Sequence, residues 1–169
     1  MNTFTFTGWS GSGKTTLISK LIHELSGRGW KVMAVKKVPD KYDLEPEGKD
    51  SRKFFEYGAQ TVYLVADKQL LKMRSIKNPD DLFEIEAEDI KDHDFVLIEG
   101  RISSESYIFE VLNSTISKTP KTDKSQLSAI ISDIPVSGGV KNFTRDNIDE
   151  IADFMEMIIK SRRRVNEKL

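Results

Sequence analysis

The sequence predicts an α/β fold with a mostly parallel sheet and one antiparallel hairpin. The glycine-rich loop "GWSGSGKTT" lies between a strand-like segment and a helix-like segment, and a second strand follows after a gap of helix length, as in a βαβ unit. The run "DFVLIEG" is almost wholly apolar, which is typical of a strand buried on both faces of a parallel sheet. These observations predict the three-layer fold of P-loop NTPases, in a single domain over residues 1–169.

The first strand, loop and helix follow in that order. The segment "TFTFT" at residues 3–7 alternates threonine with phenylalanine, as a strand entering a sheet does. The helix after the loop is expected to end at residues 26–29, "SGRG", because glycine readily takes the left-handed conformation that closes a helix. Its buried face is predicted from helical spacing to hold Leu17, Ile18, Leu21, Ile22 and Leu25.

The other elements are predicted from alternation, apolar runs and helix signals. Two β-rich runs joined at Asp67-Lys68 predict an antiparallel hairpin, and the polar segment 113–125 predicts a mobile surface loop. Asn78-Pro79 is expected to open an acidic helix that reaches Ile90, and Asp146 to cap the last helix. The expected strands are residues 31–38, 61–66, 70–76, 94–100, 107–112 and 127–132, with a short helix over 51–59. The buried face of the last helix is predicted to hold Ile148, Ile151, Ala152, Met155 and Ile158.

The loop has the spacing of a phosphate-binding motif, since four residues separate Gly8 from the run Gly13-Lys14-Thr15. Its glycines leave room for backbone N–H groups to converge on phosphate oxygens at the positive end of a helix. Lys14 adds a charge for the β- and γ-phosphates, and the Thr15 hydroxyl is placed to hold Mg²⁺. A glycine-serine surface turn that matches by chance is the alternative. The predicted nucleotide-binding residues are Gly8, Trp9, Ser10, Gly11, Ser12, Gly13, Lys14, Thr15 and Thr16.

Glu99 ends the predicted buried strand. In open α/β sheets ligands collect at the carboxyl ends of the strands, which is also where the phosphate loop lies. A carboxylate at this edge holds Mg²⁺ or orients an attacking water. The alternative is a strand-end glutamate that only meets solvent.

A second polar segment follows the second strand. The stretch "YDLEPEGKDS" at residues 42–51 places Asp50 and Ser51 in a loop near the same edge. Asp50 or Ser51 as an ordinary helix cap is an equally good interpretation.

Composition narrows the class of protein. The formal net charge is −1, which indicates no binding of nucleic acid through overall charge. The absence of cysteine excludes disulfides and thiolate metal sites. No secretory signal pattern and no apolar run of membrane-spanning length is found, so a cytoplasmic protein without a membrane partner is expected. His23 and His93 are predicted to be incidental.

Taken in order, several segments resemble the MobB family of molybdopterin-guanine dinucleotide biosynthesis proteins. They are "FTGWSGSGKTTLISKLI", "VKKVPDKYDLEPEGKDSRKFFEYGA", "DFVLIEGR", "YIFEVL", "AIISDIPV" and "FTRDNIDEIADFM", which together span nearly the whole chain. The resemblance implies a GTP-binding homodimer with slow GTPase activity. It also implies that the protein helps a MobA-like guanylyltransferase to attach GMP to the molybdopterin cofactor.

The resemblance also implies roles for matching positions. It assigns the P-loop to the phosphates, Thr15 and Glu99 to Mg²⁺, and Asp50 to the active edge as a polar group. Asp133 ends a predicted strand where a carboxylate can accept the two guanine donors. The family commonly has histidines after the second strand, whereas this chain reads "KKVPDKYD" there.

The sequence thus predicts a GTP-binding protein that hydrolyses GTP slowly with Mg²⁺, using Lys14, Glu99 and Asp50. It offers no recognisable arginine finger or activating glutamine, groups that contribute a factor of about 10³ to 10⁵ in related chemistry. Two alternatives are a small-molecule kinase that uses ATP and a nucleotide-gated adaptor without turnover.

Overall fold

The computed structural model describes residues 2–38, 50–74, 87–100 and 106–166 of the chain. Its contacts divide the chain into two compact units. The first comprises Met1–Lys37 with Asp80–Leu169, and the second comprises Val38–Pro79. The single domain expected from the sequence stays a prediction.

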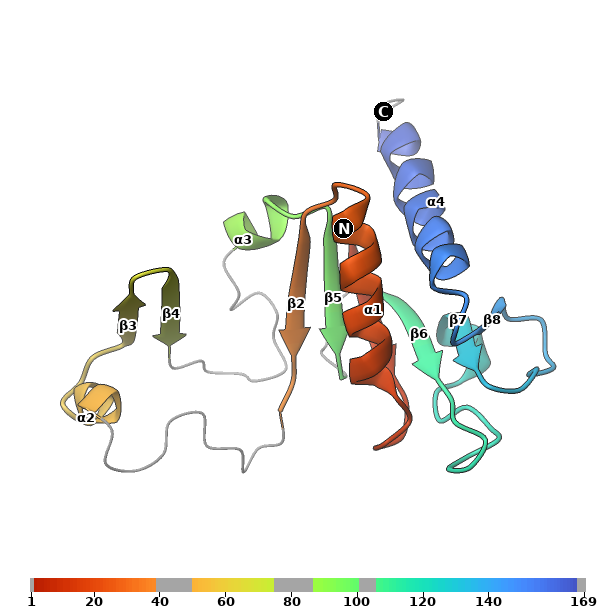
Figure 1. Ribbon diagram of the computed structural model, residues 1–169, viewed down its shortest axis with the longest axis horizontal. Coiled ribbons are helices and arrows are strands. Elements are labelled where there is room, and N and C mark those ends of the chain that lie inside the picture. The colour runs from red at the N-terminus through yellow and green to blue at the C-terminus, as the bar shows by residue number, and fades with distance from the viewer. Residues whose placement is uncertain (1, 39–49, 75–86, 101–105, 167–169) are drawn as a thin grey trace. The chain divides into compact units, whose positions relative to one another are not determined.

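A six-stranded sheet forms the first unit, in the order β2-β5-β1-β6-β7-β8 (Figure 1). Every neighbouring pair in it is parallel, so the carboxyl ends of all six strands lie at one edge. Phe6 in the first strand and Lys36 in the second both pair with Glu99. The strands are β1 (Thr3–Thr7), β2 (Val32–Lys36), β5 (Phe95–Glu99), β6 (Tyr107–Val111), β7 (Leu127–Ser132) and β8 (Asn142–Thr144).

The predicted parallel sheet is confirmed, with one strand more than the sequence indicated. β8 is only three residues long, and Phe143 is its one buried apolar side chain. A strand of three residues is too short to show a pattern of alternating apolar and polar residues, so the sequence does not predict it. In the structure β8 is identified by its pairing with β7. The apolar run of β5 is buried on both faces of the sheet, as predicted. Phe95 and Leu97 belong to one buried cluster and Val96 and Ile98 to another.

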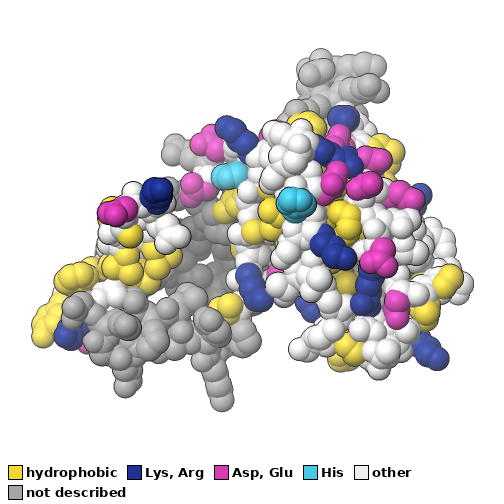
Figure 2. All heavy atoms as spheres, in the orientation of Figure 1, with side chains coloured by type: hydrophobic (Ala, Val, Ile, Leu, Met, Phe, Trp, Pro, Cys, Tyr) yellow, Lys and Arg dark blue, Asp and Glu magenta, His cyan; other side chains and the backbone are white. Residues whose placement is uncertain are grey.

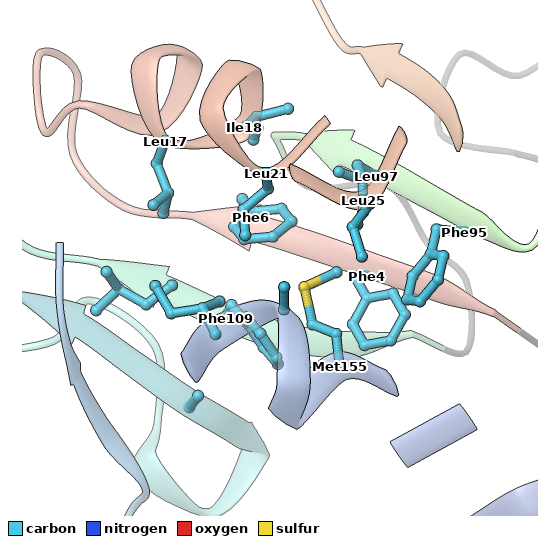
Figure 3. Close-up of a cluster of buried hydrophobic side chains, with 14 of the residues drawn as sticks. Phe4, Phe6, Leu17, Ile18, Leu21, Leu25, Phe95, Leu97, Phe109 and Met155 are labelled. Carbon is cyan, nitrogen blue, oxygen red and sulfur yellow. The ribbon is translucent and has the colours of Figure 1, made fainter. Parts of the chain in front are cut away.

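Two helices, α1 (Lys14–Gly27) and α4 (Ile148–Asn166), pack beside each other on one face of the sheet. Figure 3 shows Leu17 and Leu21 of α1 pointing towards the phenylalanines of β1, with Met155 of α4 in the same cluster. On the other face, Ile90 of α3 (Ala87–Lys91) packs against β5. The sheet therefore lies between helical layers, as the sequence predicts.

The end of α1 is where its sequence predicts it. Gly29 has a φ of 87°, and its N–H donates to the carbonyl of Ser26 at 3.0 Å. The N–H of Trp30 returns to the carbonyl of Leu25 at 3.1 Å. This left-handed closure lets the chain turn directly into β2.

The last helix departs from its prediction in two details. It begins at Ile148, so Asn147 and not Asp146 directly precedes it, and the Asp146 carboxylate lies 3.7 Å from the Lys20 ammonium. Its buried face holds Ile151, Ala152, Met155 and Ile159. Ile148 and Ile158, which were also predicted to lie on that face, are only partly buried. α4 packs against α1. The spacing of apolar residues along α4 does not by itself determine which side chains this contact buries.

The second unit contains α2 (Asp50–Glu56) and an antiparallel pair, β3 (Thr61–Ala66) with β4 (Gln69–Arg74). The predicted hairpin is confirmed, and Ala66 pairs with Gln69 across its turn. The acidic helix predicted from Pro79 lies mostly outside the described residues. Its described part is α3.

None of the helices in the described ranges combines the length and the apolar character that crossing a membrane requires.

Candidate functional site

The phosphate loop joins β1 to α1 at the carboxyl edge of the sheet. Gly13 is the N-cap of α1 in the left-handed conformation, with φ 95°. In the described part of the chain no side chain caps this helix, and its first turn has no acidic residue. The first amides of α1 are therefore available to an anionic ligand, which the helix dipole also favours.

Gly8 at the start of the loop passes very close to β6. Its φ is 136°, and a Cβ atom at this position would lie 2.4 Å from the carbonyl oxygen of Val111. Any other residue would force the loop and the strand apart. The first glycine of the motif is thus needed to seat the loop against the sheet.

Lys14 lies across its own loop. Its Nζ donates to the carbonyl oxygens of Gly8 at 3.1 Å and Trp9 at 2.8 Å. Burial lowers the pKa of Lys14 and the charge of Glu99 opposes that shift, while Lys121 and Lys36 lower the pKa further. The hydrogen bonds described for this ammonium go to two carbonyl oxygens, and a phosphate is a stronger partner for it.

Glu99 contacts one residue of α1 and one residue of β2. Its Oε1 accepts a 2.8 Å hydrogen bond from the Thr15 hydroxyl, and its Oε2 lies 3.3 Å from the Lys36 ammonium. The structure therefore brings together Thr15 and Glu99, the two residues predicted to hold Mg²⁺. The contact with Lys36, at the end of β2, was not predicted.

The donor set suits Mg²⁺ bound with a nucleotide. Among the described residues no group of three or more His, Cys, Asp or Glu side chains could hold a metal by itself. Mg²⁺ usually takes one or two protein oxygens and completes its shell with waters and phosphates. The hydroxyl of Thr15 and the carboxylate of Glu99 match that requirement.

Asp133 follows β7 at the same edge but already has partners. Its Oδ1 and Oδ2 accept hydrogen bonds from the Ser114 amide at 2.9 Å and hydroxyl at 2.6 Å. These bonds lower the pKa of Asp133, and the guanidinium of Arg145 at 3.7 Å adds to the effect. Asp133 thus holds the loop after β6, and its remaining lone pairs are open to a ligand.

Arg145 comes to the site from the end of β8. It donates a hydrogen bond to the Leu112 carbonyl, and its Nη1 lies 3.5 Å from where a Cβ atom on Gly13 would be. A guanidinium therefore flanks the phosphate loop. The sequence did not indicate this, because Arg145 follows a strand too short to recognise.

A third unpredicted cation is Lys121, in the polar segment 113–125. Its ammonium lies 5.1 Å from the ring centre of Trp9 in the phosphate loop. The segment has no strand or α-helix, as expected, but hydrogen bonds to Glu110 and Asp133 attach it to the sheet. No periodicity or motif marks Lys121 in the sequence.

Three further residues form none of the hydrogen bonds or ion pairs described for the loop, although His23 lines one groove with Thr15 and Thr16. Asp50 begins α2, but its side chain lies outside the described residues, so its expected role is untested. His23 lines a groove of about 650 Å³ beside α1, and His93 contacts the carbonyl of Asp89.

Known proteins resemble this chain over most of its length. Residues 3–133 match the model of the MobB family, described as molybdopterin guanine dinucleotide synthesis protein B. A Haemophilus influenzae protein named molybdopterin-guanine dinucleotide biosynthesis adapter protein is 33% identical over 154 residues, covering 89% of this chain and 85% of that protein. An Escherichia coli protein of the same name is 26% identical over 155 residues, covering 89% of each.

Solved structures share the fold. A crystal structure of molybdopterin-guanine biosynthesis protein B (mobB) has a TM-score of 0.66 and 25% identity, covering 94% of this chain and 99% of that chain. Bacillus subtilis MobB, at 20% identity, has a TM-score of 0.67 and covers 91% of this chain and 97% of its own. The architecture described above is thus that of solved MobB structures.

Proposed function

The chain belongs to the MobB family, and from that premise we propose that it is a GTP-binding adapter protein of molybdopterin-guanine dinucleotide biosynthesis. In this proposal it hydrolyses GTP slowly with Mg²⁺ and assists a MobA-like guanylyltransferase in attaching GMP to the molybdopterin cofactor. The adapter role is supported by the names of the two bacterial relatives.

One observation carries the nucleotide part of the proposal. The Thr15 hydroxyl and the Glu99 carboxylate, which are distant in sequence, lie 2.8 Å apart beside the uncapped start of α1. The arrangement supplies backbone donors for phosphates and two hard oxygen ligands for Mg²⁺ at one place. Lys14 adds a cation for the β- and γ-phosphates.

The hydrolysis step follows from these positions. Water attacks the γ-phosphorus, the bond from that phosphorus to the bridging β–γ oxygen breaks, and GDP leaves with the electron pair of that bond. The γ-phosphoryl group becomes inorganic phosphate, and the proton of the water passes to that phosphate or to solvent. Mg²⁺ bound with the nucleotide would neutralise part of the phosphate charge. Lys14 stabilises the oxygens on which charge develops, and Glu99 contacts Thr15 and Lys36 beside it. We assign the orientation of the water to Glu99, and Asp50 stays a predicted polar group of the active edge.

We also assign the choice of base to Asp133. Each carboxylate oxygen accepts more than one hydrogen bond, so the two bonds from Ser114 leave capacity for the guanine N1–H and amino donors. Adenine presents no matching pair of donors. This assignment predicts a preference for GTP over ATP.

Replacing Lys14 by alanine tests the assignment of the site. Lys14→Ala removes the one positively charged side chain of residues 8–16. Binding of a fluorescent GTP analogue with Mg²⁺ should therefore be lost. Lys20→Ala, an exposed lysine on the same helix, is the matched control and should bind normally. Tight binding by the Lys14 variant would contradict the assignment.

Phosphate release separates this proposal from its alternatives. Slow release from GTP, absent in Lys14→Ala, is the expected result. Phosphate transfer from ATP to a small acceptor would indicate a kinase. Nucleotide binding without any release would indicate an adaptor that does not turn over.

A further inference from the structure

Lys121 lies over the phosphate loop and has no assigned role there. Its ammonium is 5.1 Å from the ring centre of Trp9, the second residue of the loop, which is 44% exposed. Its positive charge is among the causes that lower the pKa of Lys14. Two lysines from separate segments therefore meet at the same loop, an arrangement that an anion between them would stabilise.

Glu110 fixes the backbone of Lys121. The Glu110 side chain is fully buried in β6, and its two oxygens accept hydrogen bonds from the amides of Lys121 at 2.5 Å and Thr122 at 2.8 Å. A buried carboxylate is costly unless it is hydrogen-bonded, so this contact holds the segment in one place. β6 is also the neighbour of β1, the strand that leads into the phosphate loop.

A cation beside an exposed tryptophan is also an ordinary surface contact. Two features distinguish the contact between Lys121 and Trp9 from an ordinary surface contact. The segment that carries Lys121 is attached through a fully buried acid, and the aromatic partner belongs to the phosphate loop itself. Lys118, in the same segment, is exposed, and it offers a natural comparison.

We propose that Lys121 is a second phosphate-binding cation, which contacts the terminal phosphate of a bound nucleoside triphosphate from the side of Trp9. Glu110 is the positioning residue for this contact. Bound Mg²⁺ would neutralise only part of the charge of a triphosphate, and Lys14 and Lys121 together would offset the remainder. The chain then supplies by itself a charge that other enzymes of this class take from an arginine. This inference rests on the proposed nucleotide-binding function.

The test compares affinities for a non-hydrolysable GTP analogue and for GDP, by isothermal titration with Mg²⁺. Lys121→Met keeps the apolar stem on Trp9 and removes the charge, so it should weaken the triphosphate analogue by about tenfold and GDP much less. Lys121→Arg should restore most of the affinity. Lys118→Met, the matched control, should bind both nucleotides as the unmodified protein does.

Glu110→Gln tests the positioning role without removing a cation. It should weaken the triphosphate analogue in the same direction as Lys121→Met, and the double variant should lose less than the product of the two single effects. Circular dichroism checks that the variant remains folded. Full additivity of the two losses would overturn the positioning role.

Other outcomes separate the claims. Wild-type affinity of Lys121→Met for both nucleotides would show that Lys121 only packs on Trp9. Equal losses for the triphosphate and GDP would overturn the assignment to the terminal phosphate. If the unmodified protein binds neither nucleotide, both this inference and the proposed function fail.

Discussion

Glu99 was predicted from the sequence to lie at the functional edge of the sheet, whereas the cations around the phosphate loop were not. Its position after a buried apolar run predicted a carboxylate at the functional edge, and the structure places its Oε1 on Thr15. The cations around the loop were not predicted. Lys36, Lys121 and Arg145 reach it from three separate segments, and only tertiary packing decides which surface lysines and arginines meet.

Glu99→Gln should remove most of the benefit of Mg²⁺ for nucleotide binding. The amide keeps the shape of the side chain but loses the negative charge that attracts the ion. We expect affinity for the GTP analogue with Mg²⁺ to fall to nearly the level measured with a chelator. Asp146→Asn removes an exposed carboxylate elsewhere on the first unit and is the control. An undiminished Mg²⁺ effect in the Glu99 variant would remove this residue from the metal site.

At the scale of elements, long and regular patterns predicted well and short or context-dependent ones did not. The buried face of α1 was predicted correctly except at Ile22, which is only partly buried, and the apolar run of β5 is buried as predicted. β8 was missed because three residues carry no period. The buried face of α4 includes Ile159, and the predicted Ile148 and Ile158 are only partly buried. The contact between α4 and α1 is not visible in the spacing of apolar residues.

The contact between α1 and α4 includes a charged cluster around Arg28. The Arg28 guanidinium bonds the carboxylates of Glu24 at 2.7 Å, Asp153 at 2.6 Å and Glu156 at 3.0 Å. Burial alone would raise the pKa of Glu156, but hydrogen bonds from Lys160, Arg28 and the Trp30 indole outweigh it and lower the pKa to about 2. The ionised form of Glu156 is thus favoured by folding.

This cluster predicts a dependence of stability on acid. Because the folded pKa of Glu156 is below its usual 4.5, its contribution is complete above pH 4.5 and is lost as the pH falls towards about 2. Glu156→Gln should lower the free energy of unfolding by about 1–3 kcal/mol at neutral pH, and the deficit should shrink in that acid range. Urea unfolding followed by tryptophan fluorescence measures it, with exposed Asp92→Asn as the control. A deficit that does not change with pH would contradict the account.

At the scale of the whole molecule, the exposed apolar surface of the second unit bears on whether the chain forms a dimer. Its hairpin exposes apolar side chains on both strands, at Tyr63, Leu64, Val65, Leu70 and Leu71. Figure 2 shows hydrophobic side chains on the visible face of this hairpin. Val65 and Leu70 pair directly across the strands and are 78% and 65% exposed. A two-stranded hairpin is marginally stable alone, and we expect a second copy of the chain to cover this surface.

The homodimer implied by the family resemblance is therefore expected to use the hairpin. The double substitution Val65→Lys and Leu70→Lys places charges on the apolar pair and should convert a dimer into a monomer in light-scattering measurements. Gln69→Lys adds one charge at the exposed turn and should leave the dimer intact. A monomeric unmodified protein would refute the dimer, and a dimeric double variant would place its interface elsewhere.

We expect the loop at residues 8–16 to bind the phosphates of a nucleotide, and Asp133 to make GTP preferred over ATP. Isothermal titration of the purified protein with Mg²⁺, against non-hydrolysable analogues of both nucleotides in parallel, tests it most directly. We predict tighter binding of the GTP analogue, and a loss of that preference in Asp133→Asn. Tighter binding of the ATP analogue would contradict guanine recognition and favour the kinase.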